Sequence, residues 1–210
     1  MSCAYLAFTE RGLALAQQLA AACPGPVARC GAGGPGLDEW TAAQFAASDA
    51  LIYIGAVGIA VRAIAPHCRS KAADPAVVVL DECGRFAVPL LSGHLGGANA
   101  LARRLAAVCG AVPVITTATD LHGLFAVDEW AKRQGCIVAE PERIKQVSGA
   151  LLAGKCVHFT ADWPIQGTPP AGVQPAADGC TDFALTLTPT GQALHIVPRI
   201  AVLGIGCRRG

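Results

Sequence analysis

The sequence predicts a three-layer α/β fold, a mostly parallel sheet with one hairpin and helices on both faces, followed by a smaller second α/β domain. Two observations predict this fold class. Short apolar runs alternate with stretches of helical periodicity along residues 1–134, an order that builds a mostly parallel sheet covered on both faces. The tight charged turn from Asp81 to Arg85 joins two apolar runs directly, which predicts the hairpin.

The elements of the first domain follow from the spacing of apolar residues and from turn residues. Leucines and alanines at helical spacing after Gly12 predict a helix that ends before Pro24. Apolar runs bounded by Gly, Pro or Asp predict buried strands. The expected strands are 4–8, a short run near 27, 51–54, 77–80, 86–91 and 112–115. The expected helices are 12–22, the stretch that Asp38 caps, a segment through Arg62, the stretch that ends at Cys109, and 127–134.

After Gly135 the pattern changes to shorter elements and a long connection. Residues 161–180 are rich in Pro, Gly and Ala, which predicts a loop. The expected elements are strands at 136–138, 155–160, 183–187, 194–197 and 200–203 and a helix at 142–153. We therefore expect an N-terminal α/β domain at 1–134, a middle domain at 135–198 and the start of a truncated C-terminal domain at 199–210.

The composition excludes several classes of protein. Of the 210 residues, 53% are hydrophobic and 15% are charged, and the formal net charge is +1. A chain with so few charges and a net charge near zero does not have the excess of basic residues that a nucleic-acid-binding domain needs. The uncharged stretch 50–61 is too short to span a bilayer, and the N-terminus lacks the pattern of a signal peptide. We expect a cytoplasmic protein that binds neither nucleic acid nor membrane.

The ten cysteines show no metal-binding pattern. No C-x-x-C occurs, and no paired spacing typical of zinc is present. In a reducing compartment such cysteines are expected to be small buried apolar side chains. The sequence therefore predicts no protein-bound metal.

The most informative stretch runs from Leu90 to Arg104, where an apolar strand passes through three glycines into a helix. A helix that starts in glycines offers backbone N–H groups to an anion, because no Cβ blocks the approach. This predicts that Gly93, Gly96 and Gly97 line an anion or oxyanion pocket. His94 is the one side chain in the turn that titrates near neutral pH, so it is either an acid–base group or a residue that holds the turn. Ser92 lacks the flanking glycine of the G-x-S-x-G nucleophile elbow, because residue 90 is Leu. The sequence therefore disfavours Ser92 as a nucleophile.

Two other turns follow predicted strands. Gly55 to Gly58 leads into a helix that carries Arg62, which either clamps a carboxylate or lies in solvent. Thr116 to Asp120 follows the last predicted strand of this domain, 112–115, and is rich in hydroxyls. Ligands of parallel sheets bind beyond the carboxyl ends of the strands, so we expect all three turns to converge at one edge. Asp120 would then orient His94 or cap a helix.

Four ordered segments resemble the signature runs of the CbiG family of cobalamin-biosynthesis proteins. They are Gly58 to Pro66, Asp74 to Val77, Leu91 to Asn99 and Pro113 to Asp120. Residues 135–198 resemble the middle domain of that family, and 200–210 resemble the opening of its C-terminal, CobE-like domain, most of which this sequence lacks. His67 stands where the family pattern leads us to expect an aliphatic residue.

The resemblance implies the activity of cobalt-precorrin 5A hydrolase in the anaerobic route to vitamin B12. That reaction opens a δ-lactone of the corrinoid and releases acetaldehyde, giving cobalt-precorrin 5B. It implies proton transfer by His94 with Asp120 as orienter, and substrate binding by the remaining candidates. These are Gly58, Arg62, Ser92, Gly93, Gly96, Gly97, Asn99, Thr116 and Thr117. The cobalt arrives with the substrate, so no cofactor is expected, and a separate CobE-like domain is a candidate partner.

Two other functions stay open at this point. A chain without the C-terminal domain could bind a corrinoid intermediate without turning it over. A nucleotide-binding domain is the third reading, because Gly31 to Gly36 formally matches G-x-G-x-x-G. Pro35 interrupts that loop, and Ala56 stands where an acidic residue is required, so a plain loop is the better interpretation.

Overall fold

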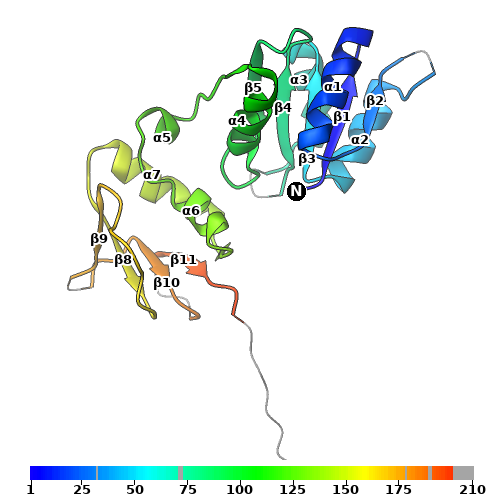
Figure 1. Ribbon diagram of the computed structural model, residues 1–210. Helices are drawn as coiled ribbons and strands as arrows, with labels where there is room; N and C mark the ends of the chain where they lie inside the picture. Colours follow the sequence, from blue (N-terminus) through cyan, green and yellow to red (C-terminus); the bar gives the residue numbers. More distant parts are fainter. Residues whose placement is uncertain (32, 71–72, 178, 189–190, 201–210) are drawn as a thin grey trace, which may run out of the picture. The chain divides into compact units, whose positions relative to one another are not determined.

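The computed structural model describes the chain except residues 32, 71–72, 178, 189–190 and 201–210 (Figure 1). The chain forms two compact units, Met1–Leu121 and His122–Gly210, which are described separately. Residues 201–210, which hold most of the predicted start of a third domain, lie outside the described residues. No helix in the described part of the chain combines the length and the apolar character needed to cross a bilayer.

A six-stranded sheet forms the centre of the first unit, in the order β2-β1-β3-β4-β5-β6. Its strands are β1 (Cys3–Ala7), β2 (Val27–Arg29), β3 (Ala50–Ile54), β4 (Ala76–Leu80), β5 (Phe86–Leu91) and β6 (Val112–Pro113). The helices are α1 (Glu10–Ala22), α2 (Leu37–Ala47), α3 (Val57–Ile64), α4 (Ala98–Cys109) and α5 (Ala118–Leu121), with a 3-10 turn η1 (Ala65–His67). The predicted mostly parallel α/β sheet is confirmed.

The predicted hairpin is confirmed as the antiparallel pair β4–β5, whereas the other strand pairs of this sheet are parallel. Asp81 closes the connection, because its carboxylate accepts hydrogen bonds from the backbone N–H groups of Cys83, Arg85 and Phe86. These three bonds explain why a charged pentapeptide reverses the chain tightly.

Both faces of this sheet are covered by helices (Figure 1). Alternate residues of a strand point to opposite faces, so Ile52 of β3 packs on the side of α1 and α4. Its neighbour Tyr53 packs on the side of α2 and α3, where its ring contacts Trp40 at 5.5 Å between centroids. The fully apolar strands are thus explained by burial on both faces.

The second unit holds a five-stranded sheet in the order β7-β11-β10-β8-β9, with one antiparallel pair, β7–β11. Its strands are β7 (Ile137–Val138), β8 (Val157–Ala161), β9 (Val173–Pro175), β10 (Phe183–Leu185) and β11 (Leu194–Val197). Its helices are α6 (Val127–Arg133) and α7 (Ile144–Leu152), with a 3-10 turn η2 (Pro141–Arg143). β9 lies inside the stretch predicted as a loop. A three-residue strand that ends in proline at a sheet edge gives almost no sequence signal.

The cysteines differ from the expectation that they are uniformly buried. Cys3 and Cys23 are buried, but Cys68, Cys83, Cys156 and Cys180 are exposed. Cys83 illustrates the reason, because it occupies the hairpin turn, where the carboxylate of Asp81 holds the backbone and the side chain faces solvent. The sequence position of such a cysteine in a turn decides its exposure more than its apolar character does.

Candidate functional site

The turn between β5 and α4 has a backbone that requires its glycines. Gly97 is the N-cap of α4 in the left-handed conformation (φ +88°), which glycine adopts without a steric cost. A Cβ on Gly96 would lie 2.3 Å from the Cβ of Ser92 and 2.7 Å from its carbonyl oxygen. Ser92 itself has φ +56° and is held by a hydrogen bond from its hydroxyl to the carbonyl of Asp74, at 2.9 Å. The turn is therefore a fixed structure.

Replacing Gly96 by alanine is expected to destabilise the first unit by about 2–3 kcal/mol, because the new methyl group overlaps the backbone of Ser92. The free energy of unfolding in urea measures the effect. Gly36→Ala is the matched control, since a Cβ there meets open space and φ is −67°. Equal unfolding midpoints for the two variants would show that the turn is not packed as described.

Two of the first backbone N–H groups of α4 are used within the turn. Ala98 donates to the carbonyl of Ser92 at 3.1 Å, and Asn99 donates to the carbonyl of Gly93 at 3.0 Å. The expectation that the start of this helix leaves its N–H groups open to an anion is wrong for these two. The reason is that the chain folds back over the helix end and supplies the acceptors itself. A role for the amides of Gly93, Gly96 and Gly97 stays a prediction.

Asp120 is the centre of a hydrogen-bond network that contains His94. Its Oδ2 accepts from His94 Nε2 at 2.7 Å, from Asn99 Nδ2 at 3.0 Å and from the hydroxyl of Thr117 at 2.6 Å. Its Oδ1 accepts from the guanidinium of Arg103 at 2.6 Å. Asn99 also donates to the hydroxyl oxygen of Thr117 at 2.9 Å. The turn, α4 and the segment after β6 thus meet at one carboxylate.

The network fixes the ionisation of Asp120. Burial of the carboxyl opposes its ionisation, but hydrogen bonds from Thr117, Arg103 and His94 outweigh burial and lower the pKa of Asp120 well below the ordinary aspartate value. Its side chain is 10% exposed and that of His94 is 16% exposed. Asp120 is therefore an ionised acceptor, held by donors from three segments of the chain.

This arrangement sets the tautomer of His94. An ionised carboxylate only accepts hydrogen bonds, so Nε2 of His94 carries the proton in the contact with Asp120. A neutral imidazole in this tautomer has its basic lone pair on Nδ1, and the carboxylate stabilises the imidazolium that forms when Nδ1 takes up a proton. The pair has the chemistry of a general base with an orienting carboxylate.

Only two of the three predicted turns meet. β5 runs antiparallel to β4, so Leu91 at its carboxyl end pairs with Val77 near the amino end of β4. Gly55 instead donates to the carbonyl of Leu80, at the carboxyl end of β4. Val77 and Leu80 are three residues apart along β4, which separates the two edges by about 10 Å at ~3.3 Å per residue.

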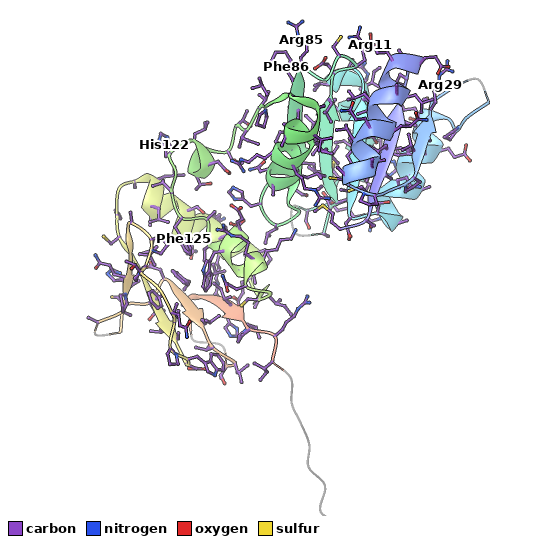
Figure 2. The ribbon with its side chains drawn as sticks, in the orientation of Figure 1. Arg11, Arg29, Arg85, Phe86, His122 and Phe125 are labelled. Carbon is purple, nitrogen blue, oxygen red and sulfur yellow. The ribbon has the colours of Figure 1, made fainter. Side chains whose placement is uncertain are left out.

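The predicted convergence of all three turns is therefore wrong, because the hairpin reverses the last two strands. Gly58 and Arg62 belong to the edge of Gly55, where the guanidinium of Arg62 covers Gly58. In Figure 2 the labels Arg85 and Phe86 mark the hairpin turn, which follows the carboxyl end of β4 and therefore lies at this edge of the sheet. Their predicted contact with a substrate stays untested, but they do not belong to the network around Asp120.

Some of the other predicted site residues lie in the network around Asp120 and some do not. Asn99 and Thr117 are within the network, whereas the hydroxyl of Ser92 is used by the turn and Thr116 is exposed. Sequence reasoning missed Arg103, which donates to Asp120. Thr119 belongs to the hydroxyl-rich turn whose threonines are expected to donate to a carboxylate, and its hydroxyl lies 3.5 Å from Nε2 of His94. Arg103 follows Asn99 by four residues on α4, so helical spacing was the signal that places both on one face.

The comparisons with known proteins identify the family of the chain. Residues 39–120 match the family model described as "Cobalamin synthesis G N-terminal", and residues 125–184 match "Cobalamin biosynthesis central region". A cobalt-precorrin-5A hydrolase from Salmonella typhimurium is 39% identical over 183 residues, covering 79% of this chain and 52% of the relative. One from Priestia megaterium is 33% identical over 182 residues, covering 76% of this chain and 49% of the relative. The chain thus spans about half the length of these two relatives.

A solved structure shares the fold. The crystal structure of a cobalamin biosynthesis protein G homolog from Sulfolobus solfataricus superposes with a TM-score of 0.56 at 20% identity. The match covers 94% of this chain and 60% of that one. Together the two family models match more than half of the sequence, and the chain belongs to the CbiG family, of which it contains the N-terminal and central regions.

Proposed function

We propose that this chain acts as a cobalt-precorrin-5A hydrolase, opening the δ-lactone of the corrinoid and releasing acetaldehyde. The observation that carries the proposal is the contact of His94 with an ionised Asp120, in a stretch that matches the N-terminal family model. The relatives named as this hydrolase support the general activity. The detailed chemistry follows from what the two side chains can do.

The first step of the proposed reaction is hydrolysis of the lactone. Nδ1 of His94 takes a proton from water as the water oxygen attacks the lactone carbonyl, and Asp120 stabilises the imidazolium that results. The tetrahedral oxyanion needs hydrogen-bond donors, and we assign this role to the backbone amides of Gly93, Gly96 and Gly97. Collapse breaks the carbonyl carbon–oxygen bond of the ring, giving a carboxylate and a secondary alcohol.

The second step breaks a carbon–carbon bond. A base removes the proton of the new alcohol, the oxygen forms the carbonyl of acetaldehyde, and the electron pair of the broken bond stays on the macrocycle. Asn99 donates to Asp120 and to Thr117, and Thr117 donates to Asp120, so in this proposal both side chains hold the carboxylate of Asp120 in place during both steps. In this proposal cobalt belongs to the substrate, and the protein needs no cofactor.

Anaerobic incubation of the purified chain with cobalt-precorrin 5A, with acetaldehyde trapped as a hydrazone, tests the proposal. We expect one acetaldehyde for each macrocycle consumed. The assay is repeated with a separately produced CobE-like domain, which we propose as a partner. Tight binding of the substrate without acetaldehyde in either assay would contradict the proposal and favour a protein that only binds the intermediate.

A further inference from the structure

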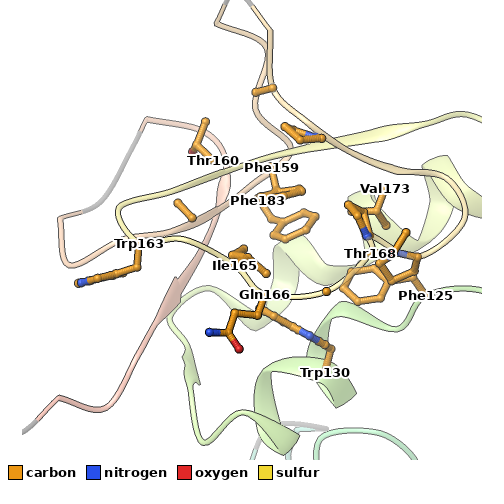
Figure 3. Close-up of a pocket in the computed structure, with 16 residues that line it drawn as sticks. Phe125, Trp130, Phe159, Thr160, Trp163, Ile165, Gln166, Thr168, Val173 and Phe183 are labelled. Atoms are coloured by element: carbon orange, nitrogen blue, oxygen red, sulfur yellow. The ribbon is translucent and has the colours of Figure 1, made fainter.

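The second unit contains a cavity of about 680 Å³ that has no part in the chemistry proposed for His94 (Figure 3). Its walls come from α6, β8, β9, β10 and the loop that follows β8. The volume lies in the range of sites that bind small molecules.

Aromatic rings form a large part of its lining. Phe183 contacts Phe159 at 5.7 Å and Phe125 at 5.9 Å between ring centroids, and Phe125 contacts Trp130 at 6.1 Å. With Trp163, five aromatic side chains line one cavity in a chain whose aromatic content is only 5%. Such a surface favours a flat ligand that can lie against ring faces and edges.

The charge and the exposure of the lining residues restrict further which ligands fit the cavity. None of the described residues that line the cavity is charged; Thr160, Gln166 and Thr168 are its polar side chains. A charged group would enter without a counterion, which is costly. Trp163 is 38% exposed and Ile165 is 41% exposed, so two large apolar side chains of the rim remain in contact with solvent. A large apolar side chain left exposed beside a cavity is a sign of a binding site.

The loop that carries the rim is built to hold its shape. Pro169 and Pro170 of this loop line the cavity together with Pro175, the last residue of β9, and each proline fixes its own backbone φ. Val173 donates its N–H to the carbonyl of Pro170 at 3.0 Å, which closes a turn beneath the rim. A wall with little freedom to lose binds a rigid ligand at a smaller entropic cost.

We propose that this cavity binds a tetrapyrrole-derived ligand by its conjugated ring and not by its acidic side chains. The inference rests on the proposed function for the identity of the ring as a corrinoid. The flatness of the bound part and the exclusion of acid groups follow from the lining of the cavity.

Equilibrium dialysis of the 210-residue chain against dicyanocobinamide, a corrin with an uncharged amide periphery, tests the inference. We expect saturable binding at one site, read from the corrin absorbance. Trp163→Ala should weaken binding about tenfold and Ile165→Ala about threefold, because each removes exposed apolar surface that the ring would cover. Propane-1,2,3-tricarboxylate, which carries acid groups without a ring, should not displace the corrin.

Leu152→Ala is the matched control, since Leu152 is 44% exposed on α7 and does not line the cavity. It should bind dicyanocobinamide as the unmodified chain does. Absence of saturable binding, or equal binding by Trp163→Ala and Leu152→Ala, would overturn the inference. Loss of binding in a chain extended to the length of the relatives would also overturn it, because the cavity would then hold a protein segment. If the chain releases acetaldehyde but does not bind dicyanocobinamide, only this inference is contradicted. If it binds dicyanocobinamide but releases no acetaldehyde, only the proposed function is contradicted.

Discussion

His94→Ala is expected to lower the rate of acetaldehyde release by about 10³-fold, within the ~10²–10⁴-fold range of a positioned acid–base group. The variant keeps the carboxylate of Asp120 and its bonds from Thr117, Asn99 and Arg103, so the site loses its base and keeps these hydrogen bonds. Single-turnover measurements with substrate bound beforehand separate the chemical step from binding.

His158→Ala is the control for this variant. His158 also faces an aspartate, with Nδ1 at 3.5 Å from Asp182, but its side chain is 37% exposed and lies in the second unit. Its removal should leave the rate within twofold of the unmodified chain. Equal rates for the His94 and His158 variants would show that the imidazole of His94 only supports the turn.

Asp120→Asn is expected to lower both the rate and the stability of the first unit. In the unmodified chain the donors around Asp120 face an ionised carboxylate that accepts their hydrogen bonds. In the variant the amide turns an N–H group toward these donors, and this mismatch costs about 2 kcal/mol of unfolding free energy. It also reverses the tautomer preference of His94, so we expect a loss in rate of about 100-fold. Urea unfolding and the single-turnover assay measure the two effects independently.

The pH dependence of this stability loss has a defined sign. The pKa of Asp120 is lowered in the folded chain, so its contribution is complete above the ordinary aspartate pKa of about 4. It is lost as the pH falls from there toward the folded pKa. The difference in unfolding free energy between the unmodified chain and Asp120→Asn should therefore shrink as the pH falls below about 4. A difference that grew below pH 4 would contradict an ionised Asp120.

The layers of the fold were predictable because burial on both faces leaves a plain trace in the sequence. Runs such as 51–54 and 77–80 are apolar without alternation, and they are the central strands β3 and β4. The charged turn at Asp81 predicts the hairpin equally well. β9 was not predictable, since its three residues are held in place by pairing with β8.

The site was predictable in part. The glycines, His94 and Asp120 lie together, as their placement after two neighbouring strands leads one to expect. Gly58 and Arg62 were wrongly grouped with them, because the rule for parallel sheets was applied to a strand that the hairpin turns around. Arg103 was missed because side-chain length, not position in a turn, brings its guanidinium to Asp120.

Chemical rescue of His94→Ala by added imidazole tests the central claim most directly, since a free imidazole can replace a proton-transfer group but cannot repair a turn. We expect imidazole to restore acetaldehyde release in a saturable manner, to raise it most above the pKa of imidazole, and to leave the unmodified chain unaffected. Release by His94→Ala at the unmodified rate, or a lost rate that imidazole does not restore, would contradict proton transfer by His94.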